Sequence, residues 1–138
     1  MYKNTLFISW VALLFLIAVL HISALQFSLY WVYSWFDIMM HFLGGVFVGL
    51  SALWFFFQSG HIKRTQTLQN VILVIAGAII AVGVGWEVFE VLAGIPMEAN
   101  FVADTILDLV MDGIGATTAS IVFIKLYNTK EVVSGEEA

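Results

Sequence analysis

Four long apolar stretches constrain this chain more than any other feature of its sequence. They cover residues 5–25, 37–57, 71–93 and 103–127, and a helix needs about 20 apolar residues to cross a bilayer core about 30 Å thick. Charged residues make up only 11% of the chain, and it has no Cys. This composition excludes a soluble domain, a disordered chain, a disulfide scaffold and a zinc ribbon. The sequence predicts an all-α integral membrane bundle of four transmembrane helices.

We predict that the first apolar stretch is a retained helix and not a cleaved signal peptide. Its apolar run is long, its basic region has only Lys3, and Ile22-Ser23-Ala24 is a weak cleavage site. The basic residues then set the orientation, because positive charges stay on the cytoplasmic side. In an up-and-down arrangement all five basic residues fall on one side of the membrane, so we predict that both termini are cytoplasmic. These residues are Lys3, Lys63, Arg64, Lys125 and Lys130.

The connections between the helices differ in character. Residues 26–36 are rich in Trp, Tyr and Phe, which settle at the headgroup boundary, so we expect a membrane-surface segment there. Residues 59–69 form a polar inner loop, and residues 94–100 form a short outer connection. We expect residues 1–128 to be a single transmembrane domain and residues 129–138 to be a flexible cytoplasmic tail.

Glycine recurs along the last three helices. Gly45-x-x-x-Gly49 has the small-xxx-small spacing that lets helix backbones approach closely in lipid. We interpret it as a packing signal without chemistry. Gly-rich faces of this kind would also allow copies of the chain to form an oligomer.

Six acidic residues and one His lie in or at the edges of the last three helices, where ionisable groups are costly and usually functional. They are Asp37 and His41 (i,i+4), Glu87 and Glu90 (i,i+3), and Asp104, Asp108 and Asp112 (i,i+4,i+8). Residues at these spacings share one face of a helix. Each of the three helices therefore presents an acidic face.

The direction of each helix places these groups at matching heights in the outer half of the membrane. At 1.5 Å per residue, an inner tier lies roughly 6–9 Å below the outer surface and consists of His41, Glu87 and Asp108. Asp112 is expected about 12 Å below that surface. The groups expected nearer the mouth are Glu90, Asp37 and Asp104.

Unpaired acids at these depths would be costly. Each one costs about 2.5–3.5 kcal/mol on insertion scales, so four would cost on the order of 12 kcal/mol. That is comparable to the whole stability of a small domain, about 5–15 kcal/mol. Because no Lys or Arg lies beside them in these helices, water, protons or a bound cation must offset the cost.

A divalent metal cation answers both the desolvation cost and the mutual repulsion of the acids. Oxygen ligands suit Mg, Mn or Ca, and the single imidazole also admits Zn or Fe. The candidate metal ligands are Asp37, His41, Glu87, Glu90, Asp104, Asp108 and Asp112. Two alternatives stay open, namely a proton or cation pathway and protonated, hydrogen-bonded structural acids.

Other residues have weaker claims to a functional role. His21 could be a further ligand, or an axial haem ligand together with His41, but nothing else supports haem and a structural role is favoured. Asp104 could simply be the N-cap of the last helix. We expect His61 to be solvated and Trp86 to pack or anchor.

Three motifs give the chain a family resemblance. They are Asp37-x-x-x-His41 before Gly44-Gly45, Glu87-x-x-Glu90, and Asp108-x-x-x-Asp112-x-x-Gly115-Ala116. Together they resemble the VanZ-like membrane proteins and the related YjdF-type inner-membrane proteins. Glu90 stands where the VanZ-like pattern has Gln, and Asp112 stands where it has Asn. The resemblance implies a small bacterial multi-pass protein of the inner membrane and a link to the cell envelope, without an established reaction.

If the chain is an enzyme, we expect metal-assisted hydrolysis or transfer on a phosphorylated or lipid-linked envelope substrate. The metal would polarise a phosphoryl oxygen or activate water, with Glu90 as general base and Asp112 as a second catalytic carboxylate. The lack of Arg or Lys on the outer side to hold a phosphate weighs against this. The alternatives are proton or cation transport along the Asp stripe, and a non-catalytic membrane partner with a structural metal. The bilayer is the expected surrounding, and no nucleic-acid partner is expected.

Overall fold

The chain folds into four long helices and one short one. The computed structural model describes residues 2–62, 65–93 and 100–135, with side chains over 8–62, 65–92 and 100–125. The helices are α1 (Tyr2–Phe27), α2 (Leu29–Val32), α3 (Ser34–Phe57), α4 (Leu68–Ala93) and α5 (Phe101–Gly135). Four are long and apolar enough to cross a membrane, over Ile8–Phe27, Ser34–Phe57, Leu68–Leu92 and Phe101–Lys125. The predicted all-α fold with four candidate transmembrane helices is confirmed.

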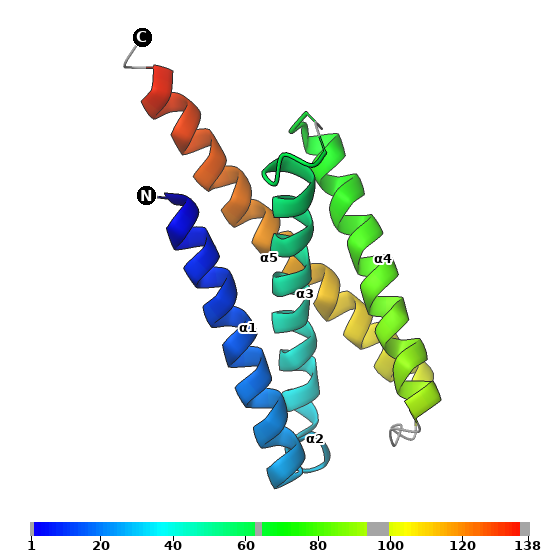
Figure 1. Cartoon of the computed structure of the whole chain (residues 1–138). Coiled ribbons are helices and arrows are strands. Elements are labelled where there is room, and N and C mark those ends of the chain that lie inside the picture. The colour runs from blue at the N-terminus through cyan, green and yellow to red at the C-terminus, as the bar shows by residue number, and fades with distance from the viewer. Residues whose placement is uncertain (1, 63–64, 94–99, 136–138) are drawn as a thin grey trace.

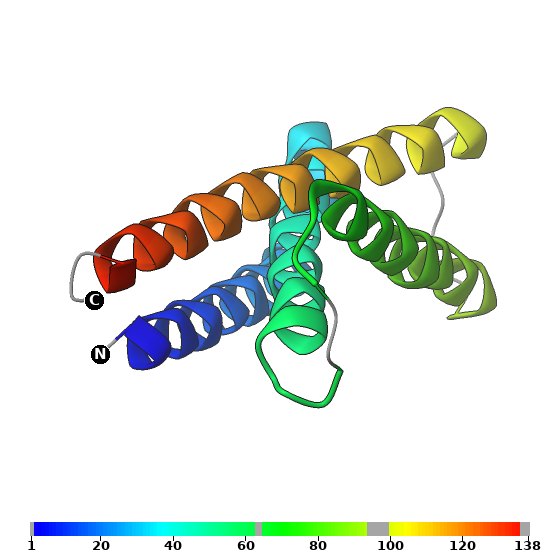
Figure 2. The ribbon, with the colours of Figure 1, turned by 90° about the horizontal axis from the view of Figure 1, so that it is seen from above.

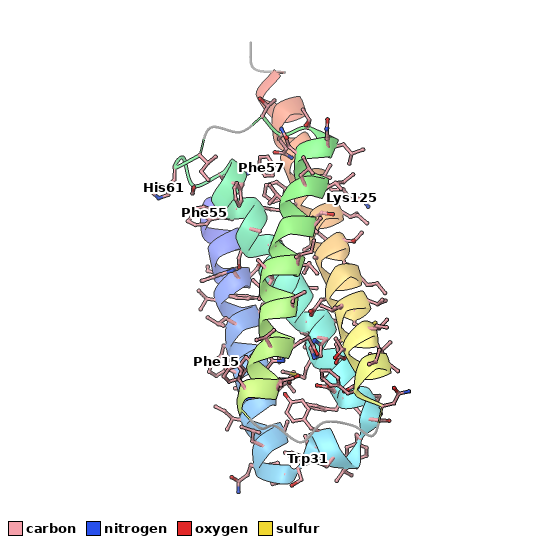
Figure 3. The ribbon with its side chains drawn as sticks, turned by 90° about the vertical axis from the view of Figure 1, so that its right-hand side faces the viewer. Phe15, Trp31, Phe55, Phe57, His61 and Lys125 are labelled. Carbon is pink, nitrogen blue, oxygen red and sulfur yellow. The ribbon has the colours of Figure 1, made fainter. Side chains whose placement is uncertain are left out.

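Helix α3 lies at the centre of the bundle, and Figures 1 and 2 show α1 and α4 on opposite sides of it. It packs against α1, α4 and α5, whereas the backbones of α1 and α4 do not contact each other in the described part of the chain. The helices run up and down, so α2 lies at one end of the bundle and both chain termini lie at the other. We call these the α2 end and the terminal end. Figure 3 shows Trp31 at the first and Phe57 and His61 at the second.

Small residues bring α3 and α5 into backbone contact. Gly45 faces the backbone carbonyl of Asp112, and Gly115 in turn faces the backbone of α3. A Cβ atom added to Gly49 would lie 2.9 Å from the Cα of Ala116. Because neither helix has room for a larger side chain here, the Gly45-x-x-x-Gly49 spacing acts as the packing signal that the sequence indicates. Such contacts favour an oblique crossing, typically about 40°, and Figure 1 shows α5 crossing α3 obliquely.

An apolar core fills the terminal end of the bundle. Its buried residues come from α3, α4 and α5 and are Leu53, Val71, Val74 and Phe123. The rings of Phe57 and Phe123 lie 6.4 Å apart beside it. The contact between α3 and α5 therefore changes along its length, from polar residues at the α2 end, through glycines, to apolar residues at the terminal end.

Trp10 of α1 makes a polar and an aromatic contact with α3. Trp10 Nε1 donates a hydrogen bond to Ser51 Oγ at 2.8 Å, and the Trp10 ring stacks on Phe47 with centroids 5.1 Å apart. Most other described α1 side chains are exposed, including Phe15. In a membrane this exposed apolar surface faces lipid, which is as apolar as the side chains themselves.

The helix ends differ from the expected ones in two places. Within residues 26–36, Ser28 has a left-handed backbone (φ 56°) that separates α1 from the short α2, and α3 already begins at Ser34. At the other end, α5 runs to Gly135, through most of the segment expected to be a flexible tail. The sequence between Gly115 and Gly135 contains no Gly or Pro that would end a helix. Residues 94–99 of the second connection and the pair Lys63 and Arg64 lie outside the described residues.

Candidate metal centre

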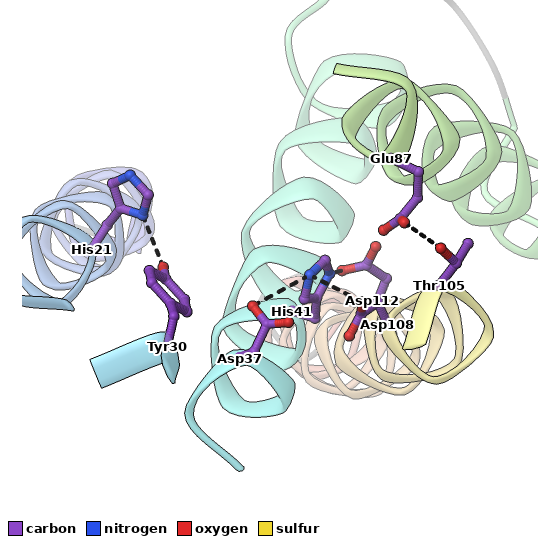
Figure 4. A network of polar contacts seen from close by, with 8 residues as sticks. All are labelled: His21, Tyr30, Asp37, His41, Glu87, Thr105, Asp108 and Asp112. Carbon is purple, nitrogen blue, oxygen red and sulfur yellow. Dashed lines mark hydrogen bonds and ion pairs between the residues drawn. The ribbon is translucent and has the colours of Figure 1, made fainter. Parts of the chain in front are cut away.

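His41 is a buried imidazole surrounded by carboxylates from α3 and α5 (Figure 4). Its Nε2 lies 3.8 Å from Asp37 Oδ1 and 3.7 Å from Asp108 Oδ2. Its Nδ1 lies 3.4 Å from Asp112 Oδ1. Asp108 and Asp112 are also buried, whereas Asp37 is only partly covered. One imidazole therefore stands among three carboxylates in the half of the bundle nearer the α2 end.

The close contact between α3 and α5 explains why these side chains meet. Asp37 and His41 are one turn apart on α3, and the same face continues to Gly45. Asp108 and Asp112 are one turn apart on α5, and the Asp112 backbone is the surface that Gly45 touches. Because the two backbones touch at Gly45, the polar side chains near this contact, on α3 and on α5, lie in the space between the two helices and face each other.

The two imidazole nitrogens face different partners. One ligand atom each from Asp37, His41 and Asp108 lie within 4.8 Å of one another. Metal–ligand bonds of about 2.0–2.6 Å place two ligands of one ion about 3–5 Å apart, so this spacing suits a single ion next to Nε2. Asp112 is on the Nδ1 side, where a carboxylate that accepts the Nδ1 hydrogen orients the ring of a metal-binding His.

Two buried carboxylate oxygens lack a hydrogen-bond partner among the described residues. They are Asp108 Oδ1 and Glu87 Oε1, on side chains of residues that are 3% and 7% exposed. The other Glu87 oxygen, Oε2, accepts a hydrogen bond from Thr105 Oγ1 at 2.7 Å. A buried unsatisfied polar group costs about 1–3 kcal/mol, more if it is charged. Both oxygens are therefore available to a cation or to water.

Among the described side chains, no Lys or Arg lies beside this cluster. Helices α3 and α4 contain no Lys or Arg, and the first basic residue of α5 is Lys125. Lys125 follows Asp112 by thirteen residues, or roughly 20 Å along the helix. Within the described residues, His41 is the one ionisable group among these acids that can carry positive charge. Three to five carboxylates around one imidazole leave a net negative site, even when the His is protonated.

Glu90 and Asp104 lie at the edge of the cluster and not among its three grouped ligand atoms. Glu90 is within electrostatic range of Glu87 and Asp37, and Asp104 is within range of Asp108. The interpretation of Asp104 as an N-cap is wrong, because α5 already begins at Phe101 and its first N–H groups bond to Asn100. Asn100 Oδ1 accepts the Ala103 N–H at 3.4 Å. Asp104 instead lies in the first turn, where negative charge is favourable.

The family comparison supports the membrane character of the chain. A family described as "Predicted membrane protein (DUF2238)" matches residues 2–129. The chain belongs to this family. The DUF2238 match includes all four candidate transmembrane helices and every residue of the acidic cluster. No curated protein and no solved structure matches the chain, so the chemistry of this DUF2238 protein is argued from its site.

A second polar contact, between His21 and Tyr30, lies beside the cluster (Figure 4). His21 Nδ1 and the Tyr30 hydroxyl are 2.8 Å apart and join α1 to α2. Burial, together with the negative charges of Asp37 and Glu90, raises the pKa of Tyr30 to about 12. Tyr30 is therefore a neutral hydroxyl near Asp37 and Glu90. His21 bonds to α2 and not to the cluster. His61 is exposed, as expected.

Two residues of this DUF2238 site were absent from the sequence prediction. Thr105 shares a face with Asp108 and Asp112 at i,i+3,i+7, and that spacing could have identified it. Tyr30 has no such signal, because it is one of several aromatic residues in a connecting segment. The Asp112 backbone faces Gly45, which follows Asp37 by eight residues, or roughly 12 Å along α3. Its carboxylate contacts His41 Nδ1 at 3.4 Å.

Proposed function

We propose that this chain is a membrane protein that binds one divalent cation between α3 and α5. In this proposal Asp37, His41 Nε2 and Asp108 are ligands, and Asp112 holds the ring through Nδ1. The observation that carries the proposal is the buried Asp108 carboxylate, which faces His41 with one oxygen and has no hydrogen-bond partner for the other among the described residues. Glu87, Glu90 and Asp104 supply further negative charge around the ion.

The ligand chemistry favours a borderline or hard cation. Three or more carboxylate oxygens suit Mg or Mn, and one imidazole nitrogen also accepts Zn or Fe. Because Mn accepts both ligand types and is detected by its paramagnetism, it is the probe of choice. The number of acids also suits a divalent ion, since one added proton would neutralise only a single carboxylate.

We propose that the site faces the outer side of a bacterial inner membrane. The distribution of the five Lys and Arg residues supports this orientation. The resemblance of the motifs to VanZ-like and YjdF-type proteins supports the bacterial envelope as the setting. In this orientation the α2 end, with its aromatic side chains, lies at the outer headgroup boundary.

The reaction class we propose is hydrolysis or transfer on a phosphorylated or lipid-linked envelope substrate. The cation would polarise a phosphoryl oxygen or activate water. Glu90, half-buried and outside the three grouped ligands, would serve as general base. Asp112 would assist by holding the imidazole. The cation also substitutes for the missing outer Arg or Lys, because it supplies the positive charge that a phosphate needs.

Proton or cation transport is the second candidate, and one observation weighs against it. Beyond Asp112 the described Thr and Ser side chains of α5 bond to their own helix. Thr117 donates to the Gly113 carbonyl at 2.8 Å, and Ser120 donates to the Thr117 carbonyl at 2.7 Å. These hydroxyls satisfy backbone groups and form no chain leading from Asp112. A third candidate, a structural metal in a protein that docks a larger partner, shares the same cation site.

Metal binding tests the shared part of the proposal. Purified protein in detergent is titrated with Mn²⁺ and followed by electron paramagnetic resonance, and its metal content is measured by elemental analysis. Asp108→Asn and His41→Asn should each weaken Mn²⁺ binding by at least about tenfold, since even an outer partner of a ligand is worth 10–100-fold. The matched control is His61→Asn, which changes an exposed His and should leave binding unchanged.

A wild-type protein without Mn²⁺ affinity, and with the same melting temperature in chelator, would overturn the cation site. The catalytic part is tested separately, by Mn²⁺-dependent release of phosphate from phosphatidic acid in mixed micelles. Glu90→Gln should keep Mn²⁺ binding and lose the activity. Wild-type protein that binds Mn²⁺ but shows no turnover of this phosphomonoester would refute phosphomonoester hydrolysis and favour the structural metal.

A further inference from the structure

A groove of about 300 Å³ opens between α1, α3 and α4. It exists because the backbones of α1 and α4 both pack on α3 but not on each other. Its apolar walls are formed by Leu14, Ile17, Phe47, Val48, Ile79 and Val82. Every one of these residues lies within a candidate transmembrane segment. The groove therefore opens sideways, toward the interior of the bilayer.

Two ionisable residues lie at one end of the groove, whose lining is otherwise apolar. His41 and Asp112 line it toward the α2 end, together with Trp86. Along α3 the lining continues through Gly44 to Val48, which is seven residues beyond His41, or roughly 10 Å deeper. Along α4 it continues from Trp86 through Gly83 to Ile79, over the same length. A lipid of the adjacent leaflet has the same polarity, with its head group at the α2 end and its chain toward the middle of the membrane.

Two glycines keep the polar end of the groove open. A Cβ added to Gly44 would lie 3.9 Å from Asp112 Oδ1, and one added to Gly83 would lie 2.9 Å from Asp112 Oδ2. The Asp112 carboxylate therefore sits against two positions that lack side chains, one on α3 and one on α4. A side chain at Gly83 would force the carboxylate to shift, whereas a Cβ at Gly44 would make an ordinary contact with it.

We propose that this groove binds the hydrocarbon chain of a membrane amphiphile that enters from the bilayer, with its polar head group at His41 and Asp112. The acidic site repels an anionic head group on its own, so the proposal rests on the proposed function for its charge balance: the bound cation links a phosphate to the carboxylates. This defines the substrate class as a lipid phosphate that arrives laterally. The chain supplies binding energy through burial in the groove, and the cation selects the head group.

Photocrosslinking tests the groove with two matched pairs of variants. The protein is reconstituted into phosphatidylcholine vesicles that contain a small fraction of phosphatidic acid with a diazirine in its acyl chain, and crosslinked residues are mapped by mass spectrometry. Val82→Trp fills the groove, whereas Val84→Trp changes a Val outside its lining. The two residues are similarly exposed, Val82 to 50% and Val84 to 43%. Leu14→Trp and Leu16→Trp form the second pair, on α1.

We expect crosslinks to concentrate on the groove and to fall at least about fivefold in Val82→Trp and Leu14→Trp. The two control variants should crosslink like the wild type. All four should keep Mn²⁺ binding, which shows that they fold. Crosslinks spread evenly over the lipid-facing surface, or equal loss within each pair, would overturn the groove site.

The head group is tested with the same diazirine chain on phosphatidylcholine. With Mn²⁺ present, phosphatidic acid should crosslink to the groove several-fold more than phosphatidylcholine, and a chelator should remove the difference. Equal crosslinking in Mn²⁺ would overturn the head-group selection. Groove crosslinks without Mn²⁺ binding would refute the proposed function but keep the chain site. Mn²⁺ binding with evenly spread crosslinks would refute the groove alone.

Discussion

Thr105 on α5 donates its hydroxyl hydrogen to the Glu87 carboxylate on α4 over 2.7 Å. Glu87 is buried, and its second oxygen has no hydrogen-bond partner among the described residues. The Thr105 hydroxyl is therefore a hydrogen-bond donor that compensates a buried acid, and it ties α4 to the helix that carries Asp108 and Asp112.

Replacement of Thr105 by Val should destabilise the protein. The change keeps the shape of the side chain but leaves the Glu87 carboxylate without its donor, which costs about 1–3 kcal/mol in the free energy of unfolding. The matched control is Thr118→Val, because the exposed Thr118 donates only to the Ile114 carbonyl of its own helix. Chemical unfolding in detergent micelles measures both. Thr105→Val should have little effect in a Glu87→Gln background, and a full effect there would contradict this pairing.

Gly45→Ala should destabilise the bundle, although Ala is the better helix former. Its Cβ would collide with the Asp112 backbone, and overpacking of this kind costs about 1–3 kcal/mol. In Gly77→Ala the new Cβ meets nothing within 4 Å, so helix propensity alone acts and stabilises by up to about 1 kcal/mol. Thermal unfolding of the two variants in the same micelles should shift in opposite directions. Shifts of the same sign would refute the tight crossing.

Tyr30 should ionise at a higher pH than an ordinary tyrosine. The pKa of Tyr30 is raised to about 12 by burial and by the charges of Asp37 and Glu90. Subtracting the alkaline absorbance titration of Tyr30→Phe from that of the wild type isolates this one phenol. The difference should have a midpoint near 12, against about 10 for an exposed phenol. A midpoint near 10 would show that Tyr30 is neither buried nor close to the acids.

The same shift gives a pH dependence of stability with a definite sign. Between pH 10 and 12 the folded state keeps the Tyr30 proton while the unfolded state has lost it. The contribution of Tyr30 is therefore fully present below pH 10, and it is lost as the pH rises toward 12. Unfolding followed across this range should show a steeper fall in the wild type than in Tyr30→Phe. Parallel curves for the two proteins would count against the shift.

The orientation can be tested because the chain has no native Cys. Gln26→Cys lies at the α2 end and His61→Cys lies at the terminal end, and both positions are exposed. A membrane-impermeant maleimide added to intact cells should label Gln26→Cys, and His61→Cys should be labelled only after the membrane is opened. The reverse pattern would invert the bundle and move the site to the cytoplasmic side.

The sequence predicts the fold well because each helix has its own length and apolar composition. The candidate ligands were also found from local spacing, since residues four apart share a helix face whatever their neighbours do. The angle between helices is a different matter. It depends on how Gly45 and Gly115 meet the opposite backbone, and no spacing within one helix contains that information. This is why the spacings do not show that the Asp112 carboxylate contacts His41 Nδ1, at 3.4 Å.

The features around the acidic cluster, namely Thr105, Tyr30 and the groove, were the hardest to predict. Thr105 is a common helix residue, and only its distance to Glu87 distinguishes it from the other Thr residues of α5. Tyr30 depends on the left-handed turn at Ser28, which folds α2 back toward α1. The groove depends on a missing contact, between α1 and α4, and periodicity along a single helix does not report contacts between helices.

The face of α3 that carries Asp37 and His41 is continuous with the face that carries Gly45 and Gly49. The register between α3 and α5 therefore also sets the geometry of the ligands. A shift of α3 by one residue along α5 would move the imidazole about 1.5 Å past the carboxylates of α5. Substitutions at these glycine positions, which supply no ligand atom themselves, should therefore change metal preference as well as stability.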